Sequence, residues 1–211
     1  MSDVIVFDLD DTLYPEADYV LSGVRAVAKI IADQHGHALG DELLAAARAG
    51  DDWLALACEL SELPPSAKES LLWAYRLHEP DIALTERAAQ AIATLKDEGR
   101  VMAIITDGRS VTQRLKINAL GISDIPAYIS EEYGAAKPDP SRFEVVMEEW
   151  PDRSYAYIGD NPAKDFIAPK ALGWTTIGVR RANSLYADAD APDDAQPHHW
   201  VGSVNEALPL L

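Results

Sequence analysis

The chain has 211 residues, of which 48% are hydrophobic and 25% are charged, and its formal net charge is −17. This composition is typical of a globular protein with one substantial core, and it argues against a disordered or low-complexity chain. The acidic excess opposes binding to nucleic acid or to an anionic membrane, and the single cysteine, Cys58, excludes an internal disulfide. Because we find neither a targeting segment nor a run of about 20 apolar residues, we expect a soluble cytoplasmic protein.

Short apolar runs separated by helical patterns predict the fold class. The five predicted strands are Val4 to Phe7, Val101 to Ile105, Ala127 to Ser130, Tyr155 to Ile158, and Thr175 to Val179. Strands that alternate with helices through short links are typical of a parallel sheet with both faces covered. We therefore predict an α/β fold with a doubly wound, Rossmann-like parallel sheet.

Local signals predict where two of the helices begin and end. Thr85 is expected to begin one helix that ends at Gly99. The spacing of Ser110 and Gln113 predicts a capping box, in which each side chain bonds to the backbone of the other residue, and Gly121 is expected to end that helix.

The stretch between the first and second strands breaks the alternation. No strand pattern is visible between Pro15 and Pro80, but four amphipathic helical patterns are, including Trp53 to Leu60 and a last one with a possible capping box at Ser66 and Glu69. Because this insertion follows the first strand, we expect it to form an all-α helical bundle above the carboxyl end of the sheet. The predicted division is a catalytic core of residues 1–15 and 81–211 with a helical cap of residues 16–80.

The segment Asp8-Leu9-Asp10-Asp11-Thr12 follows the first predicted strand directly and is the most informative part of the sequence. Side chains alternate along an extended backbone, so Asp8 and Asp10 should point to the same side while Leu9 enters the core. Two like charges so placed need a cation. A carboxylate pair at the carboxyl end of a buried strand therefore indicates a metal-assisted site.

Two later segments carry groups that suit a phosphate. Thr106-Asp107-Gly108 follows the second strand, where a hydroxyl and backbone amides could bind phosphoryl oxygens, although this triplet is also ordinary in turns. Lys137 lies before a proline that stiffens the backbone, and it is either a phosphate-binding cation or a solvated surface lysine.

A second acidic cluster follows the fourth strand. Asp160 leaves that strand as Asp8 leaves the first, and a short helix beginning at Asn161-Pro162 would bring Asp165 back towards the loop. The alternative interpretation is that Asp160 caps a helix and that Asp165 faces solvent.

These four segments, in this order, resemble the conserved site of the haloacid dehalogenase-like superfamily, in particular its phosphatases. The resemblance covers most of the chain and includes a cap after the first strand. It implies that Asp8 is a nucleophile that forms an aspartyl-phosphate and that Asp10 is the general acid and base. It also implies that Thr106 and Lys137, with the neighbouring Asp107 and Gly108, bind the phosphoryl group.

The same resemblance implies a Mg²⁺ cofactor. Its ligands would be the carboxylates of Asp8 and Asp160 and the backbone carbonyl of Asp10, since this ion prefers hard oxygen ligands. Asp165 would orient Lys137 or a metal-bound water, and Thr12 would form a hydrogen bond near the nucleophile loop.

The expected activity is hydrolysis of a small phosphomonoester, either a sugar phosphate or a nucleoside monophosphate. The partner would be a small phosphorylated metabolite rather than nucleic acid or a membrane. The alternatives are a pyrimidine 5′-nucleotidase, indicated weakly by Leu13-Tyr14-Pro15, a sugar phosphomutase, and a non-catalytic module that binds a phosphorylated metabolite or a protein. Two departures from the family are Asp107, where many relatives with this cap have Asn, and Pro169, which should break or kink a helix.

Overall fold

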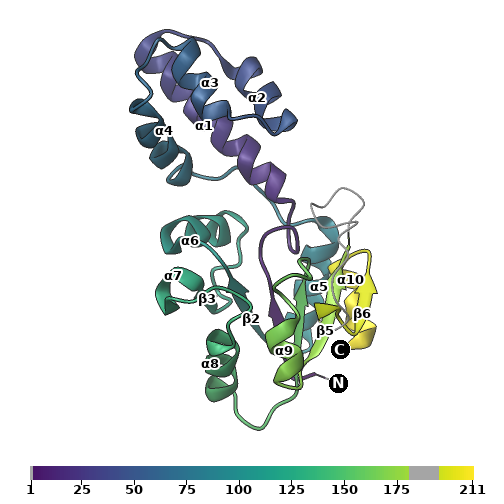
Figure 1. Cartoon of the computed structure of the whole chain (residues 1–211). Helices are drawn as coiled ribbons and strands as arrows, with labels where there is room; N and C mark the ends of the chain where they lie inside the picture. The colour runs from purple at the N-terminus through teal and green to yellow at the C-terminus, as the bar shows by residue number, and fades with distance from the viewer. Residues whose placement is uncertain (1, 181–194) are drawn as a thin grey trace. The chain divides into compact units, whose positions relative to one another are not determined.

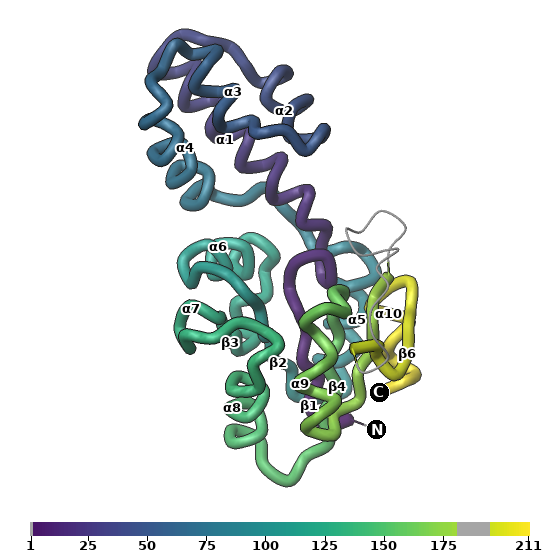
Figure 2. The backbone as a smooth tube through the Cα atoms, in the orientation of Figure 1, coloured from purple at the N-terminus to yellow at the C-terminus, as the bar shows by residue number. Residues whose placement is uncertain are grey.

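A computed structural model describes residues 2–180 and 195–211 of the chain, which forms two compact units (Figures 1 and 2). One unit consists of Met1–Pro15 and Ala83–Leu211, and the other of Glu16–Ile82. Among the described residues, no helix is both long and apolar enough to cross a membrane.

The first unit contains a sheet of six parallel strands in the order β3-β2-β1-β4-β5-β6 (Figure 1). This order confirms the predicted doubly wound α/β fold. The sequence did not predict β6, because this strand has only three residues and none of them is fully buried. The strands are β1 (Val4–Phe7), β2 (Val101–Thr106), β3 (Ala127–Ile129), β4 (Tyr155–Gly159), β5 (Thr175–Val179) and β6 (His199–Val201).

The central strand β1 determines where a ligand would bind. It pairs with β2 on one side and with β4 on the other, so that Phe7 lies opposite both Ile104 and Ile158. The chain proceeds outward from β1 first through β2 and β3 and then through β4, β5 and β6. Ligands of open α/β sheets bind at the carboxyl ends of the strands where this reversal occurs. Asp8, the next residue after β1, lies at that point.

Helices cover both faces of the sheet. Val4 and Val6 project from one face into a buried cluster that includes Phe143, Tyr157 and Trp174. The Phe143 ring meets those of Tyr157 and Trp174 edge to face, with centroids 5.1 Å and 5.4 Å away. The helices of this unit are α5 (Glu86–Asp97), α6 (Ser110–Ala119), α7 (Ser130–Tyr133), α8 (Ser141–Glu149), α9 (Ile167–Ala171) and α10 (Val204–Ala207), followed by the 3₁₀ turn η2 (Leu208–Leu210).

Two of the local predictions for this unit have different outcomes. Thr85 caps α5 as predicted, because its hydroxyl accepts a hydrogen bond from the amide of Ala88 at 3.2 Å. The capping box at Ser110 is wrong: Ser110 is already the first helical residue, and its hydroxyl donates to Glu132. The Gln113 side chain also points away from the helix backbone, towards a charged acceptor in the site.

Pro169 does not interrupt a helix. Because α9 begins only at Ile167, Pro169 lies in its first turn, where a missing backbone N–H leaves no helical hydrogen bond unmade. The preceding residues form a turn instead of the predicted short helix after Asn161, with the amide of Asp165 donating to the carbonyl of Asn161 at 2.9 Å.

The second unit consists of α1 (Glu16–His35), α2 (Gly40–Ala49), α3 (Trp53–Leu60) and α4 (Ala67–Arg76) (Figure 2). Their apolar faces form one buried cluster, which includes Val27, Leu43 and Cys58. Ser66 lies just before α4 but makes no capping hydrogen bond through its side chain, so the capping box predicted there is wrong.

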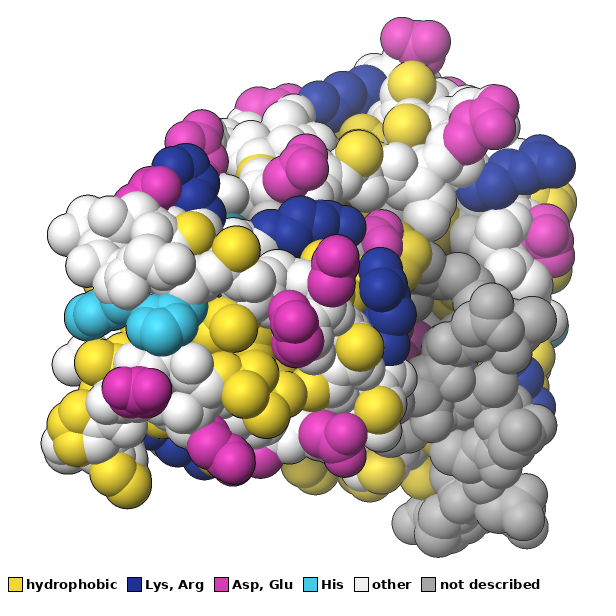
Figure 3. Space-filling model, turned by 90° about the horizontal axis from the view of Figure 1, so that it is seen from above, with side chains coloured by type: hydrophobic (Ala, Val, Ile, Leu, Met, Phe, Trp, Pro, Cys, Tyr) yellow, Lys and Arg dark blue, Asp and Glu magenta, His cyan; other side chains and the backbone are white. Residues whose placement is uncertain are grey.

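Charged residues of both signs lie on the face drawn in Figure 3. Figure 3 shows one face on which acidic and basic side chains are intermixed with hydrophobic ones, with no uniform patch of one sign. The net charge of −17 is therefore not concentrated on this face.

Candidate active site

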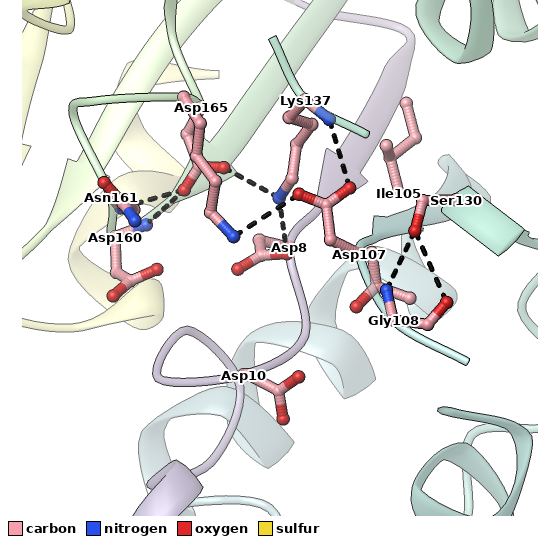
Figure 4. Close-up of polar contacts among 12 residues, drawn as sticks. Asp8, Asp10, Ile105, Asp107, Gly108, Ser130, Lys137, Asp160, Asn161 and Asp165 are labelled. Carbon is pink, nitrogen blue, oxygen red and sulfur yellow. Dashed lines mark hydrogen bonds and ion pairs between the residues drawn. The ribbon is translucent and has the colours of Figure 1, made fainter. Parts of the chain in front are cut away.

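The ends of three neighbouring strands bring the predicted site residues together. Asp8 follows β1, Thr106 ends β2, and Asp160 follows β4, while Lys137 comes from the loop before α8. Figure 4 shows Lys137 between the carboxylates of Asp8 and Asp165.

Lys137 is a buried cation and not a solvated surface lysine. Its Nζ lies 2.7 Å from Asp8 Oδ1 and 2.7 Å from Asp165 Oδ1, and it donates a hydrogen bond of 2.9 Å to the Tyr157 hydroxyl. Burial disfavours its charge, but the carboxylates of Asp165 and Asp8 outweigh that effect and raise the pKa of Lys137 well above its ordinary value. Lys137 therefore holds the nucleophile candidate by one carboxylate oxygen.

Three buried carboxylates, two of which contact this lysine, give the site an excess of negative charge. One oxygen from each of Asp8, Asp160 and Asp165 lies within 4.8 Å of the others. Burial raises the pKa of Asp8 to about 6 despite the attraction of Lys137. Burial, followed by repulsion from Asp8 and Asp165, raises the pKa of Asp160 to about 9. Such a cluster of hard oxygen donors fits a divalent cation, which would relieve the repulsion.

Asp165 supports the loop that carries Asp160. Its Oδ2 accepts hydrogen bonds from the backbone amides of Asp160 and Asn161 at 3.1 Å and 2.8 Å. A Cβ at position 159 would lie only 2.6 Å from the same oxygen, so Gly159 lets the carboxylate lie against the backbone. Asp165 is thus fully buried, and the alternative that it faces solvent is wrong.

Asp107 and Gly108 make contacts that the sequence did not indicate. Asp107 accepts hydrogen bonds from Arg142 Nη2 at 2.5 Å and from the backbone amide of Lys137 at 3.1 Å. Although burial opposes it, the charge of Lys137 and the Arg142 hydrogen bond lower the pKa of Asp107. The Gly108 amide donates to Ser130 Oγ at 2.9 Å (Figure 4), so this amide is directed at Ser130 and not at a ligand.

The carboxylate of Asp10 lies apart from the group around Asp8 (Figure 4). Its Oδ1 accepts from Lys116 Nζ at 2.7 Å and from the Tyr14 hydroxyl, and its Oδ2 accepts from Gln113 Nε2 at 2.9 Å. Burial disfavours the charge, but Lys116 and these hydrogen bonds outweigh it and lower the pKa of Asp10. Leu9 is buried as predicted, but the two carboxylates have different partners, because β1 ends at Phe7 and the residues after Asp8 no longer follow the geometry of a strand.

Two further observations concern residues of the first loop and of α6. The Thr12 hydroxyl, expected to form a hydrogen bond, is buried and has no partner within the part of the chain that the structure describes. Sequence reasoning did not identify Gln113 and Lys116 as site residues. Their spacing of three residues, which places both on one face of α6, was the available signal.

Comparisons with known proteins place the chain among hydrolases. The model of a family described as haloacid dehalogenase-like hydrolase matches residues 2–173. A glyceraldehyde 3-phosphate phosphatase of Methanocaldococcus jannaschii is 26% identical over 98% of this chain and 96% of that protein. A ribulose-1,5-bisphosphate 5-phosphatase of Halopiger xanaduensis is 26% identical over the full length of both.

A solved structure has the same fold. The magnesium-bound crystal structure of the HAD-hydrolase YfnB from Bacillus subtilis superposes with a TM-score of 0.67, covering 100% of this chain and 98% of that one. The two sequences are 18% identical, so this likeness concerns the fold alone.

Proposed function

Because the chain belongs to the haloacid dehalogenase-like hydrolase family, we propose that it is a phosphatase that hydrolyses a small phosphomonoester through an aspartyl-phosphate on Asp8. The observation that carries this proposal is the position of Asp8, a buried carboxylate at the carboxyl end of β1 with its Oδ1 on Lys137. Relatives that match the whole chain are phosphatases of small sugar phosphates, which supports the same substrate class here.

The reaction would proceed in two displacements. In the first, Asp8 Oδ2 attacks phosphorus while Lys137 holds Oδ1, and the bond from phosphorus to the ester oxygen breaks. Asp10, which must be in its protonated form at this step, gives the leaving oxygen a proton. In the second, water loses a proton to Asp10 and attacks the aspartyl-phosphate, which releases inorganic phosphate and restores the Asp8 carboxylate.

Charge neutralisation is the other requirement of phosphoryl transfer. Lys137 and the Thr106 hydroxyl would bind phosphoryl oxygens. When bound by Asp8, Asp160 and the Asp10 carbonyl, Mg²⁺ would neutralise charge on the phosphoryl group. Asp165 would keep Lys137 in place through the contact of 2.7 Å between their charged groups.

We also propose that the helical unit, Glu16–Ile82, acts as a cap that selects the substrate. The strand-end residues of the other unit handle only the phosphate, which all substrates share, so selection among esters must come from elsewhere in the chain. Leu13-Tyr14-Pro15 is a cue for a pyrimidine nucleotidase, but the relatives that match the whole chain favour a hydrolase of sugar phosphates, and no feature of the described residues favours a mutase.

The test is release of inorganic phosphate from p-nitrophenyl phosphate, measured for the wild type and for Asp8→Asn. We expect Mg²⁺-dependent turnover that EDTA abolishes and that Asp8→Asn reduces by about 10³-fold or more. Circular dichroism serves as the folding control. Equal turnover of the two proteins would refute the nucleophile assignment, and a wild type that binds phosphate without turnover would favour the non-catalytic alternative.

The substrate class needs a second experiment. A panel of triose, pentose and hexose phosphates, together with nucleoside monophosphates, should give the highest kcat/KM for a small sugar phosphate. A preference for pyrimidine nucleotides would instead support the nucleotidase.

A further inference from the structure

One face of α6 holds the Asp10 carboxylate by both of its oxygens. Lys116 Nζ donates to Oδ1 at 2.7 Å, and Gln113 Nε2 donates to Oδ2 at 2.9 Å. The Lys116 side chain is only 4% exposed, and Gln113 is also buried. Burying a lysine and an amide costs free energy unless specific partners compensate them, and here Asp10 is a partner of both.

The Gln113 amide makes a second contact within the same site. Its Nε2 also donates to Thr106 Oγ1 at 2.6 Å, so the two hydrogens of one amide group serve two different acceptors. This arrangement fixes the orientation of the amide, because its oxygen would be repelled by the Asp10 carboxylate. Since Gln113 supplies the hydrogen in this bond, the Thr106 hydroxyl keeps its own for a phosphoryl oxygen.

Gly108 makes room for this side chain. A Cβ at position 108 would lie 3.1 Å from both Cγ and Cδ of Gln113, and the φ of +144° there is a conformation that other residues adopt only with strain. The turn after β2 thus packs closely against the Gln113 side chain.

From these contacts we propose that Gln113 and Lys116 are positioning residues. They hold the Asp10 carboxylate at a fixed position relative to the Thr106 hydroxyl, which would bind the phosphate. This inference rests on the proposed function, in which Asp10 transfers the proton and Thr106 contacts the phosphoryl group. One amide sets the distance between the two, and Lys116 prevents the carboxylate from rotating. Neither side chain exchanges a proton with the substrate.

A positioning role predicts a dependence on the leaving group. p-Nitrophenolate leaves readily without a proton, whereas phenolate depends more strongly on receiving one. The two esters, p-nitrophenyl phosphate and phenyl phosphate, have nearly the same shape. Misplacing the general acid should therefore slow phenyl phosphate more than p-nitrophenyl phosphate. A defect in phosphate binding or folding would slow both esters equally.

The experiment measures kcat/KM for both esters, because this parameter reports formation of the aspartyl-phosphate. The variants are Gln113→Leu and Lys116→Met, which keep the side-chain volume and remove the donors. The matched control is Lys96→Met, which removes an exposed ion pair to Asp124 in the same unit. Unfolding in urea shows whether each variant is folded at the assay temperature.

We expect kcat/KM for phenyl phosphate, divided by kcat/KM for p-nitrophenyl phosphate, to fall roughly tenfold or more in Gln113→Leu and Lys116→Met. This ratio should stay unchanged in Lys96→Met. Lys116→Arg should recover part of the ratio. An unchanged ratio in folded variants would overturn the positioning role. If Lys116→Met fails to fold, Gln113→Leu alone decides the matter. Failure of the proposed function itself would differ, since the wild type would then hydrolyse neither ester.

Discussion

Asp8 and Asp10 are separated by one residue, yet they lie in opposite electrostatic surroundings. Asp8 shares one buried lysine with Asp165 and faces Asp160, and burial raises its pKa to about 6. Asp10 receives donors on both oxygens, which lower its pKa despite burial. The surroundings of Asp8 contain too few cations for their carboxylates and form an acid-rich region. Around Asp10, by contrast, the charge of a single carboxylate is well compensated.

This difference is what the proposed mechanism requires of two carboxylates in one loop that have separate tasks. An acid-rich region with too few cations favours a divalent metal ion, and such an ion would in turn attract a phosphoryl group. The Asp10 carboxylate, held by Lys116 and Gln113, lies outside this cluster, and in the proposed mechanism it transfers the proton. The two buried lysines, Lys137 and Lys116, are therefore not equivalent.

The largest effect that tests this contrast is expected for Lys137→Met. Removing the buried ammonium that contacts both Asp8 and Asp165 leaves two buried carboxylates uncompensated, which should cost about 3–5 kcal/mol in the free energy of unfolding. Turnover should fall roughly 10²- to 10³-fold for phenyl and p-nitrophenyl phosphate alike. Urea denaturation and kcat/KM measure the two effects. A selective loss on phenyl phosphate would contradict the separation of tasks.

The second test is the pH dependence of stability without metal. The pKa of Asp8 is raised from 3.8 to about 6, and that of Asp160 from 3.8 to about 9. Between pH 3.8 and about 9 the folded protein therefore binds more protons than the unfolded chain. The contribution of these two groups to the free energy of unfolding is fully present below pH 3.8 and is lost as the pH rises to about 9. The free energy of unfolding in EDTA should therefore decrease across this window, and Mg²⁺ should flatten the decrease.

Asp10 contributes with the opposite sign. Because its pKa is lowered in the folded protein, its contribution is present above 3.8 and is lost as the pH falls below that value. Chemical denaturation at a series of pH values, with and without Asp160→Asn, distinguishes the two regions. A slope that Asp160→Asn leaves unchanged would show that the acid-rich region does not cause it.

A smaller effect is expected at Gly108, which lies beside Gln113. Gly108→Ala places a Cβ 3.1 Å from Gln113 in a strained backbone conformation and should destabilise the protein by about 1–3 kcal/mol. The displaced Gln113 should also lower the ratio of phenyl to p-nitrophenyl phosphate turnover. Thermal unfolding and the two ester assays measure these changes, and Gly121→Ala, at a positive φ but with no neighbour within 4 Å, is the matched control.

The smallest effect is expected for Asp107→Asn, because Asn keeps one acceptor for Arg142 and the Lys137 amide but loses the charge. Asp107 Oδ2 also lies 3.4 Å from Lys164 Nζ, a weak contact. We expect a loss of about 1 kcal/mol in stability and less than about a tenfold change in turnover. A loss as large as that of Lys137→Met would mean that Asp107 belongs functionally to the acid-rich region.

The sequence predicted the sheet well because strong apolar runs mark its central strands. The positions of Asp8, Thr106 and Asp160 at the ends of those strands follow from the same pattern, since the carboxyl ends of parallel strands meet at one edge. The three-residue strand β6 was not predicted, because a short, half-exposed strand has no such apolar run.

The failed capping box at Ser110 and the missed role of Lys116 share one physical cause. Ser110 and Gln113 have the spacing of a capping box, but a charged acceptor from a distant part of the chain competes better for the Gln113 amide than a local backbone group. Lys116 similarly resembles a solvated helical lysine, and only the tertiary structure shows that Asp10 lies beside it. Local patterns contain no information about partners that are about a hundred residues away.

Gly159 limits how freely this protein can vary. Even the methyl group of alanine would occupy the space of the Asp165 carboxylate, 2.6 Å away, and would push it off the amides of Asp160 and Asn161. Lys137 would lose one of its two carboxylate partners in the same movement. If codon 159 were randomised and the library selected for activity, the surviving clones should therefore encode glycine, although no atom of this residue takes part in the chemistry.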